Sequence, residues 1–455
     1  MWYQTPVSER GGKGVPMKHR PWLTVVATVA VLVLVASACS NDEGTGEPGG
    51  GTDTETPVED EFGSIDIAAD EPINIGTLLV ISGADAALGQ DSQNGAVLAS
   101  DYLDGTFDGV DGQLLGHDIQ WKHEDELCSV EGGQAGATAL AADPSIVAVI
   151  GTSCSSAAQG VADTILSEKG ILLFSPSNTS PALTDPAAHQ PFYARTAHND
   201  RIQGAIVAEF ALNEQGATNL ATIHDESPYT QGLTAAAAAN FEAGDGTVTT
   251  QEQINSEDTD FKPVLRSIAE GDPDVLYAPV FVAACSLILK QAQEIMPDVT
   301  LMASDGCLST DVIKNAGDAV NGVFLSGPDT SAYQEGEFYA SEFRPAYEEQ
   351  FGGDPTAVFH AHAFDAANVL FDAIEAVAVE NDDGSLSIPR TALRDEVFST
   401  SGYEGLSGII TCDENGDCAT DVVIGIFEGP NWDVEGGTGD GKPVYTDTKS
   451  LDDVL

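Results

Sequence analysis

The sequence predicts an α/β protein whose folded part forms two doubly wound lobes, each built on a parallel sheet. Three observations lead to this prediction: short apolar segments alternate with amphipathic ones, the apolar segments contain no Asp, Glu, Lys or Arg, and the alternation restarts once in mid-chain. Uninterrupted apolar strands between helices are typical of a parallel sheet covered on both faces. The length of 455 residues leaves room for two or three domains.

The first series of elements starts with an apolar strand expected at 73–80. A helix at 90–102 follows, then a strand at 146–150, a helix at 156–166 and a strand at 171–175. Ile, Val and Leu dominate the three strands, so both faces of each strand are expected to be buried. These elements predict the first lobe.

The second series starts after a break near residues 195–201. Its expected elements alternate in the same way: strand 220–224, helix 231–242, strand 275–278, helix 287–295 and strand 301–303. Two separate series of this kind predict two lobes with a cleft between them, because each sheet needs its own core.

The charge balance excludes several partners. The chain has 73 acidic and 17 basic residues, which gives a net charge of −56. Such a chain repels DNA, RNA and anionic lipid head groups, so nucleic-acid binding is excluded. The hydrophobic fraction of 42% is large enough for sizeable cores. We interpret the acid excess as a solvated, self-repelling surface, which says nothing about fold or reaction.

The N-terminus, residues 1–38, has the pattern of an export signal. A basic cluster at 18–20 precedes an uncharged stretch at 21–38, whose apolar part is short for a membrane-spanning helix. The stretch ends in Ala-Ser-Ala-Cys, which resembles the bacterial lipobox, although a Leu usually stands where this chain has Ala36. In a lipobox the cysteine, here Cys39, is lipidated and becomes the first residue. Ordinary cleavage before an unmodified cysteine is the alternative, and Met17 would begin a signal of normal form.

Residues 39–70 are expected to form a tether. Gly, Thr, Pro and acidic residues dominate this segment, and such a composition favours a flexible, extended chain. A lipidated cysteine followed by such a tether would hold the folded part near a membrane while leaving it in water. The chain end at 434–455 is also rich in Gly and Asp and is expected to be a loosely ordered acidic tail.

Six cysteines remain beside Cys39, and an even number outside the cytosol indicates disulfides. Many pairings are possible, and neighbouring positions in the chain favour Cys128 with Cys154, Cys285 with Cys307, and Cys412 with Cys418. A zinc site is the weaker alternative, because the chain has no C-x-x-C motif and no His at ligand spacing from these cysteines. His360 and His362 form an H-x-H motif, but in an expected amphipathic helix, so we predict no metal site.

The segments just after each expected strand are the candidate ligand site. Ligands of open parallel sheets bind beyond the carboxyl ends of the strands. These segments are rich in hydroxyls and contain acids and aromatic rings but no Arg or Lys: Ser82-Gly83, 154–156, 175–179, 225–229, Phe281 and Ser304-Asp305. This composition suits recognition of a small molecule better than phosphate transfer.

The order of these motifs resembles that of the extracytoplasmic solute-binding proteins of ABC importers, in the branched-chain amino acid (Leu/Ile/Val) group. The resemblance covers 73–432, and its motifs are IGTLLVISGADAALGQDSQNGAVLA, VAVIGTSCSSAAQGVAD, ILLFSPSNTSPALTD, ATIHDESPYTQGL, DFKPVLRSI and SDG. It implies the type I periplasmic binding protein fold, in which three crossovers join two lobes that close on the ligand. It also implies the Cys128–Cys154 disulfide.

With three crossovers, each lobe would consist of two parts of the chain. The implied first lobe comprises 71–195 and 326–405, and the implied second lobe comprises 196–325 and 406–433.

The resemblance also implies where an amino acid would be held by its two charged groups. The hydroxyl of Ser155 and the helix N-terminus that follows it would receive the ligand carboxylate, since free N–H groups favour an anion there. Thr179 would add a second hydroxyl. The backbone carbonyl of Ser177 and the carboxylate of Asp305 would hold the ammonium, although the family has the longer Glu at the latter position.

Three further residues complete the implied site. Tyr229 would close over the ligand from the second lobe, and Leu88 would line the side-chain pocket. Phe281 stands where the family often has Tyr, so one hydroxyl contact is expected to be missing. Without the resemblance, Ser and Thr at these places would be read as helix caps and Asp305 as a turn residue.

The resemblance therefore implies a membrane-anchored, monomeric binding protein without cofactor or metal. It would capture a small amino acid or related amide and deliver it to the permease subunits of an ABC importer. One alternative is a ligand-sensing module on the same fold. The other alternative is a secreted α/β enzyme. The sequence argues against an enzyme, because it has no G-x-S-x-G motif, no P-loop and no G-x-G-x-x-G after a strand.

Overall fold

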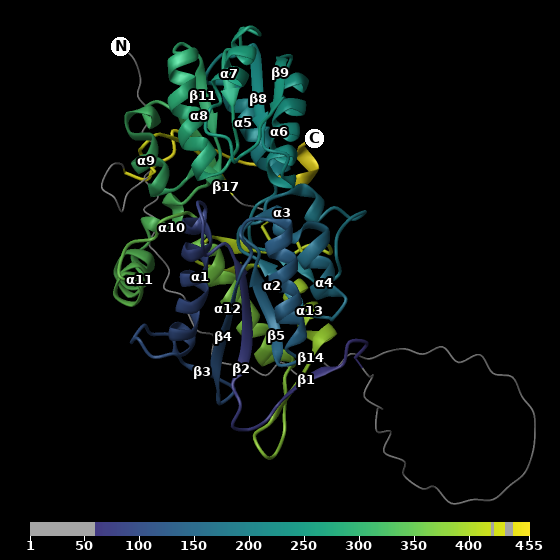
Figure 1. The fold of residues 1–455 in the computed structure, drawn as a ribbon. Helices are drawn as coiled ribbons and strands as arrows, with labels where there is room; N and C mark the ends of the chain where they lie inside the picture. The colour runs from purple at the N-terminus through teal and green to yellow at the C-terminus, as the bar shows by residue number, and fades with distance from the viewer. Residues whose placement is uncertain (1–59, 420–422, 433–439) are drawn as a thin grey trace, which may run out of the picture. The chain divides into compact units, whose positions relative to one another are not determined.

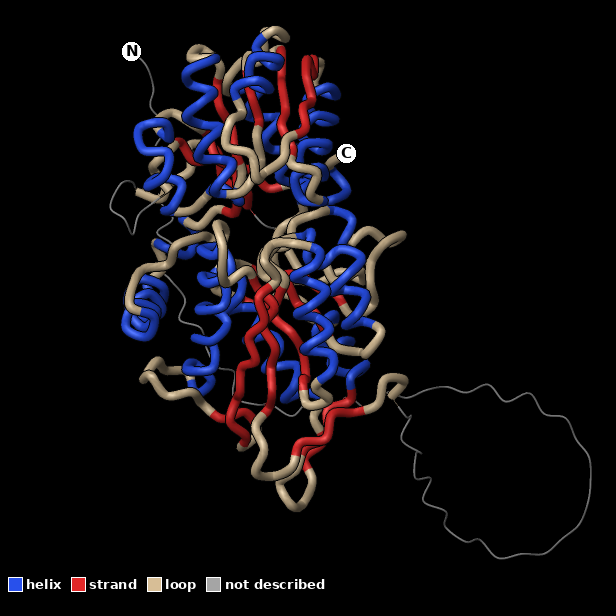
Figure 2. Tube along the Cα trace, viewed as in Figure 1, coloured by secondary structure: helices blue, strands red, loops and turns tan. Residues whose placement is uncertain are grey.

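The computed structural model describes residues 60–419, 423–432 and 440–455 (Figure 1). The predicted signal, Cys39 and most of the predicted tether lie outside these residues. Within the described residues, the α/β fold class is confirmed: each of two sheets lies between helices (Figure 2). No helix in these residues is long and apolar enough to cross a membrane.

The first lobe is built on a six-stranded sheet with the order β3-β4-β2-β5-β6-β7. All neighbouring strands are parallel except β3 and β4, which are antiparallel. The strands are β2 (Ile73–Leu79), β3 (Gln113–Leu114), β4 (His117–Asp125), β5 (Ile146–Gly151), β6 (Leu172–Ser175) and β7 (Tyr193–Arg195).

Helices cover both faces of this sheet. They are α1 (Ala86–Asp101), α2 (Val130–Ala142), α3 (Ser155–Ala157), α4 (Asp163–Ser167), α12 (His360–Val377) and α13 (Arg390–Phe398). Phe174 packs in the core that α1 and α12 share, whereas its neighbour Leu173 packs with residues of α2 and α4. Successive side chains of a strand point to opposite faces, so a strand apolar at every position serves both cores.

The second lobe is built on a seven-stranded sheet with the order β18-β17-β12-β11-β10-β8-β9. Its strands are β8 (Asn219–His224), β9 (Thr247–Gln253), β10 (Val275–Tyr277), β11 (Thr300–Ala303), β12 (Phe324–Pro328), β17 (Val423–Glu428) and β18 (Tyr445–Thr448). The first five are parallel, while β17 and β18 add an antiparallel edge. Its helices are α5 (Asp200–Asn213), α6 (Pro228–Ala243), α7 (Lys262–Ala269), α8 (Val282–Ile295) and α9 (Thr310–Ala316).

Smaller elements complete the fold. A three-stranded sheet joins β1 (Ser64–Ile67), β14 (Leu386–Pro389) and β13 (Val379–Glu380), and a hairpin joins β15 (Tyr403–Glu404) to β16 (Ile409–Ile410). The short helices α10 (Ser331–Gln334) and α11 (Arg344–Phe351) follow β12. The three disulfides pair Cys128 with Cys154, Cys285 with Cys307, and Cys412 with Cys418, as chain position predicts.

Three expectations about the ends of the lobes are wrong. The tether does not extend to residue 70, because β1 at Ser64–Ile67 pairs with β14. The chain end is not a loose tail throughout, because β18 pairs with β17 and Arg201 donates to the backbone carbonyls of Val454 and Leu455. Segment 406–418 belongs to the first lobe rather than the second, since Leu406, Ile410 and Cys418 pack in the first lobe's core.

Candidate ligand-binding site

One cavity is lined by all seven residues predicted to bind a ligand. Its lining comprises Leu88, Ser155, Ser177, Thr179, Tyr229, Phe281 and Asp305, together with Ser153 and Phe359. Several of these residues follow β5, β6 and β11, because the carboxyl ends of parallel strands meet at one edge of each sheet. Both lobes contribute to the lining.

Hydroxyl side chains form the first-lobe wall of the cavity. The Ser177 hydroxyl donates to the Ser153 carbonyl at 3.2 Å. The Ser155 hydroxyl accepts the backbone N–H of Ser180 at 3.3 Å. Thr179, which is also buried, lies between Ser177 and Ser180 in the chain. This wall offers polar groups without a charge.

The helix expected at 156–166 is interrupted, which is a correction to the prediction. Helix α3 ends at Ala157, the backbone at Gln159 and Gly160 is not helical, and α4 begins only at Asp163. A helix of three residues has little dipole of its own. The polarity of this wall therefore comes from its hydroxyls and backbone N–H groups rather than from a long helix.

An acid with two donors forms the second-lobe wall. The Oδ1 atom of Asp305 accepts a hydrogen bond from Nε2 of Gln203 at 2.8 Å and from the Tyr229 hydroxyl at 3.1 Å. The Tyr229 hydroxyl also bonds the hydroxyl of Ser304. Asp305 is only 6% exposed, so its carboxylate meets the cavity rather than bulk water. Within the lining, Asp305 is the only side chain with a formal charge at neutral pH.

The remaining wall is apolar. Leu88, Phe281 and Phe359 line it, and the rings of Phe281 and Tyr229 lie 5.3 Å apart between centroids. The cavity thus has a charged wall, a hydroxyl wall facing it, and an apolar wall between the two. This arrangement suits a ligand that has polar groups at one end and a hydrocarbon group at the other.

Arg195 supports the hydroxyl wall from behind. It is fully buried at the end of β7, and its Nη1 donates to the carbonyls of Asn178 at 3.3 Å and Ser180 at 2.9 Å, on either side of Thr179. Its Nη2 lies 2.7 Å from Oδ2 of Asp417. The guanidinium therefore fixes the loop that carries Thr179.

Glu126 supports the same wall at the disulfide. Its Oε1 accepts the backbone N–H of Cys154 at 2.8 Å. Burial raises the pKa of Glu126 well above its ordinary value, although the N–H groups of Cys154 and Ser153 act in the opposite direction. The carboxyl group thus holds the turn between β5 and α3.

Sequence reasoning missed the supporting residues and two lining residues, Ser153 and Phe359. A lone Arg inside the apolar stretch 192–197 was a usable signal, since Arg is almost never fully buried unless it is paired. Gln203 and Glu126 gave no signal, because Gln and Glu at such places are ordinarily solvent-exposed.

The family model described as "Periplasmic binding protein" matches residues 72–424. The chain belongs to this family.

A curated relative of this periplasmic binding protein is the leucine-, isoleucine-, valine-, threonine- and alanine-binding protein of Pseudomonas aeruginosa. The two are 26% identical over 359 residues, which cover 78% of this chain and 89% of the relative. Among solved structures, the leucine binding protein LivK of Thermotoga maritima has a TM-score of 0.69 and 25% identity, and covers 84% of this chain and 100% of its own.

A third comparison shows the fold alone. A solute binding protein of an ABC transporter from R. palustris, solved with benzoate, has a TM-score of 0.68 and 21% identity, with 84% of this chain and 97% of that chain covered. The family and its relatives are binding proteins, so this periplasmic binding protein is a binding protein and not an enzyme.

The surroundings of the two histidines of the H-x-H motif are defined in the structure of this periplasmic binding protein. Nδ1 of His360 lies 3.0 Å from Oδ2 of Asp91, and burial lowers the pKa of His362 to about 3. The described residues contain no group of three or more potential metal ligands.

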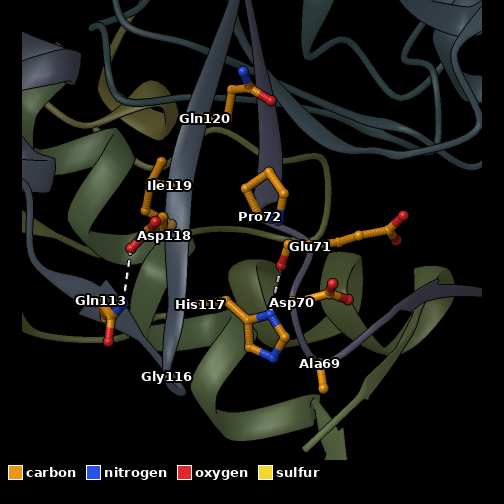
Figure 3. A pocket seen from close by; sticks show the side chains of 10 residues that line it. All are labelled: Ala69, Asp70, Glu71, Pro72, Gln113, Gly116, His117, Asp118, Ile119 and Gln120. Carbon is orange, nitrogen blue, oxygen red and sulfur yellow. Dashed lines mark hydrogen bonds between the residues drawn. The ribbon is translucent and has the colours of Figure 1, made fainter.

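A larger hollow lies elsewhere on the first lobe of this periplasmic binding protein. It has about 830 Å³ of empty space up to its open mouth, and its lining includes Asp70, Glu71, Gln113, His117 and Asp118 (Figure 3). This hollow surrounds the beginnings of β2 and β4, opposite the strand ends where ligands of such sheets bind. Both ring nitrogens of His117 contact backbone carbonyls of the protein, so the imidazole already has protein partners on both sides.

Proposed function

We propose that this protein captures a free amino acid between its two lobes. The observation that carries the proposal is the buried carboxylate of Asp305, which faces an uncharged hydroxyl wall across one small cavity. An ammonium group would pair with Asp305, while the ligand carboxylate would accept hydrogen bonds from the hydroxyls of Ser155 and Thr179. The named amino acid ligands of the Pseudomonas aeruginosa relative support the same ligand class.

The apolar wall supports an aliphatic amino acid. Leu88, Phe281 and Phe359 offer hydrocarbon contacts to a ligand side chain. An aromatic acid without an amino group would leave the charge of Asp305 buried and unpaired, which is costly. The site therefore favours an amino acid over a simple carboxylic acid such as benzoate.

A thermal-unfolding screen tests the proposal. Leucine, isoleucine, valine, threonine and alanine would be compared with benzoate and with 4-methylpentanoate, which is leucine without its amino group. A ligand at 100 times its Kd should stabilise the folded protein by about 2.7 kcal/mol. The proposal fails if no amino acid raises the unfolding temperature, or if 4-methylpentanoate raises it as much as leucine does.

The substitution Leu88→Ala should change specificity among aliphatic ligands. Leu88 is 8% exposed and lines the cavity, so its removal deletes apolar contacts that only a larger ligand side chain can make. One methylene in an apolar pocket is worth about 1–3 kcal/mol of discrimination. We expect the affinity for leucine to fall about tenfold relative to that for alanine, measured by calorimetry. Equal losses for both ligands would contradict this role.

We further propose that the protein acts as a monomer, delivers its ligand to an ABC importer and is anchored through a lipid on Cys39. The Ala-Ser-Ala-Cys sequence after an apolar export signal supports the anchor. The substitution Cys39→Ala should release the protein into the medium or leave it unprocessed, as cell fractionation and mass spectrometry of the N-terminus would show. Recovery of the unaltered protein wholly in the medium, without lipid, would refute the anchor.

A further inference from the structure

The side chain of Gln203 is buried behind the acid of the ligand cavity. Gln203 belongs to α5, is fully buried and is not among the residues that line the cavity. Its Nε2 donates to Oδ1 of Asp305 at 2.8 Å, and to the hydroxyl and carbonyl oxygens of Ser326 at 2.8 and 3.2 Å. An amide nitrogen has two protons, so Gln203 ties the acid of the cavity to strand β12.

The amide group of Gln203 points in one direction only. Its oxygen, Oε1, lies 2.5 Å from Nε2 of His198, which is also fully buried. Burial lowers the pKa of His198 and outweighs the opposing influences of Asp305 and Gln203, so the ring is neutral at neutral pH. Nδ1 of this ring has no hydrogen-bond partner, so its single proton is on Nε2 and faces the amide oxygen. A reversed amide would set its oxygen against oxygen atoms of Asp305 and Ser326.

His198 lies between the lobes. It belongs to the segment 196–199, which joins β7 of the first lobe to α5 of the second. Its ring stacks on that of Phe359, which lines the cavity, with 6.5 Å between centroids and 19° between planes. The hydrogen bonds from His198 to Gln203 and from Gln203 to Asp305 therefore lead from the joining segment to the cavity.

The two carboxylate oxygens of Asp305 differ in their surroundings. Oδ1 accepts from Gln203 and, at 3.1 Å, from the Tyr229 hydroxyl. No described residue donates to Oδ2, and Oδ2 is not among the buried polar atoms that lack a partner. Two protein donors on one oxygen thus leave the other oxygen available to a ligand.

We propose that Gln203 is a positioning residue of the ligand site: its amide holds Oδ1 of Asp305, so that Oδ2 faces the ligand ammonium. His198 acts through Gln203 by fixing the direction of the amide. The inference rests on the proposed function, because it requires a ligand with an ammonium group. Without the amide, the carboxylate could turn about its side-chain bond, and ordering it again on binding would lower the affinity.

The substitution Gln203→Met tests the role of the amide. Methionine has a similar length but no N–H group, so affinity should fall about tenfold, as expected for the loss of a hydrogen bond to a charged group. Calorimetry measures the Kd of the tightest binder among leucine, isoleucine, valine, threonine and alanine. The matched control is Gln291→Met, which should leave this Kd unchanged. Gln291 is a buried glutamine of the same lobe, but its amide holds the backbone of Thr259 and Phe261.

A double-mutant cycle with Asp305→Asn separates positioning from general damage to the fold. In the Asp305→Asn background no charge remains to be positioned, so adding Gln203→Met should change Kd by less than about twofold. A merely structural role of Gln203 predicts instead that the two losses of affinity multiply.

A second variant keeps the test decisive if Gln203→Met does not fold. His198→Phe keeps a ring next to Phe359 but gives the amide oxygen no donor, so affinity should fall, and this loss should disappear in the Asp305→Asn background. The inference is overturned if either folded variant binds the amino acid as tightly as the unaltered protein, or if its loss multiplies with that of Asp305→Asn. These outcomes leave the proposed function intact, which fails if no amino acid binds the unaltered protein.

Discussion

Asp305→Asn is expected to lower the affinity for an amino acid at least ~30-fold while leaving the fold intact. The substitution keeps the shape of the side chain and its Oδ1 acceptor for Gln203 and Tyr229, but removes the charge that pairs with the ligand ammonium. Loss of one partner of a buried charge pair costs about 2–5 kcal/mol, and about 1.4 kcal/mol is a factor of ten in Kd. Calorimetry with leucine measures the change.

Two controls separate charge pairing from general damage. Asp311→Asn removes an exposed acid of the second lobe and should leave Kd unchanged, since Asp311 is 42% exposed on α9. Any residual binding of 4-methylpentanoate should weaken little in Asp305→Asn, because this ligand has no ammonium to lose. Unaltered leucine binding by Asp305→Asn would show that Asp305 only shapes a turn.

Asp417→Ala is expected to reduce the free energy of unfolding by about 3–5 kcal/mol. Arg195 and Asp417 are 0% and 1% exposed and lie 2.7 Å apart, so the substitution leaves a buried cation without its counter-charge. Arg195 also holds the carbonyls on either side of Thr179, so affinity for leucine should fall as well. Urea unfolding and calorimetry measure the two effects.

The matched control is an exposed ion pair. Lys314 and Asp311 lie 2.8 Å apart but are 67% and 42% exposed, and Asp311→Ala should cost less than about 1 kcal/mol. Similar losses for Asp417→Ala and Asp311→Ala would contradict the importance of the buried pair.

The buried ion pair of Arg195 and Asp417 also makes the stability of the folded protein depend on pH. Burial raises the pKa of Asp417, but the charge and hydrogen bonds of Arg195 outweigh it and hold the pKa below the ordinary value of 3.8. A depressed pKa in the folded state means stabilisation that is present above about pH 4 and is lost as the pH falls further. The pair should therefore add to acid unfolding but not to any change near neutral pH.

The parts of the fold that the sequence predicted are those with local signals. Strand β5 is continuously apolar because both of its faces are buried, and this composition is visible in a short window of sequence. Strand β9 reads TVTTQEQ and has no buried residue, so nothing in its composition marks it. It is held by backbone hydrogen bonds to β8, and β18 is held in the same way at the other edge.

The residues of the candidate site also differ in whether the sequence alone could identify them. Serines and threonines after strand ends can be predicted, because the topology of a parallel sheet brings those ends together. The burial of Asp200 and Gln203 could not be predicted from the sequence. An acid in the first turn of a helix is ordinarily exposed to solvent, where it interacts with the helix dipole. Only the packing of α5 beneath both walls shows that these two side chains are buried.

The discontinuous course of the chain has a consequence for how the protein is synthesised. A nascent chain released up to residue 328 would contain every parallel strand of both sheets. It would still lack α12, which packs on β5 and β6, and β17, which pairs with the edge of β12. Such a fragment exposes an apolar sheet face and an open strand edge, both of which favour aggregation. Neither lobe can therefore mature before the last part of the chain has been made, and no contiguous fragment will yield one lobe alone.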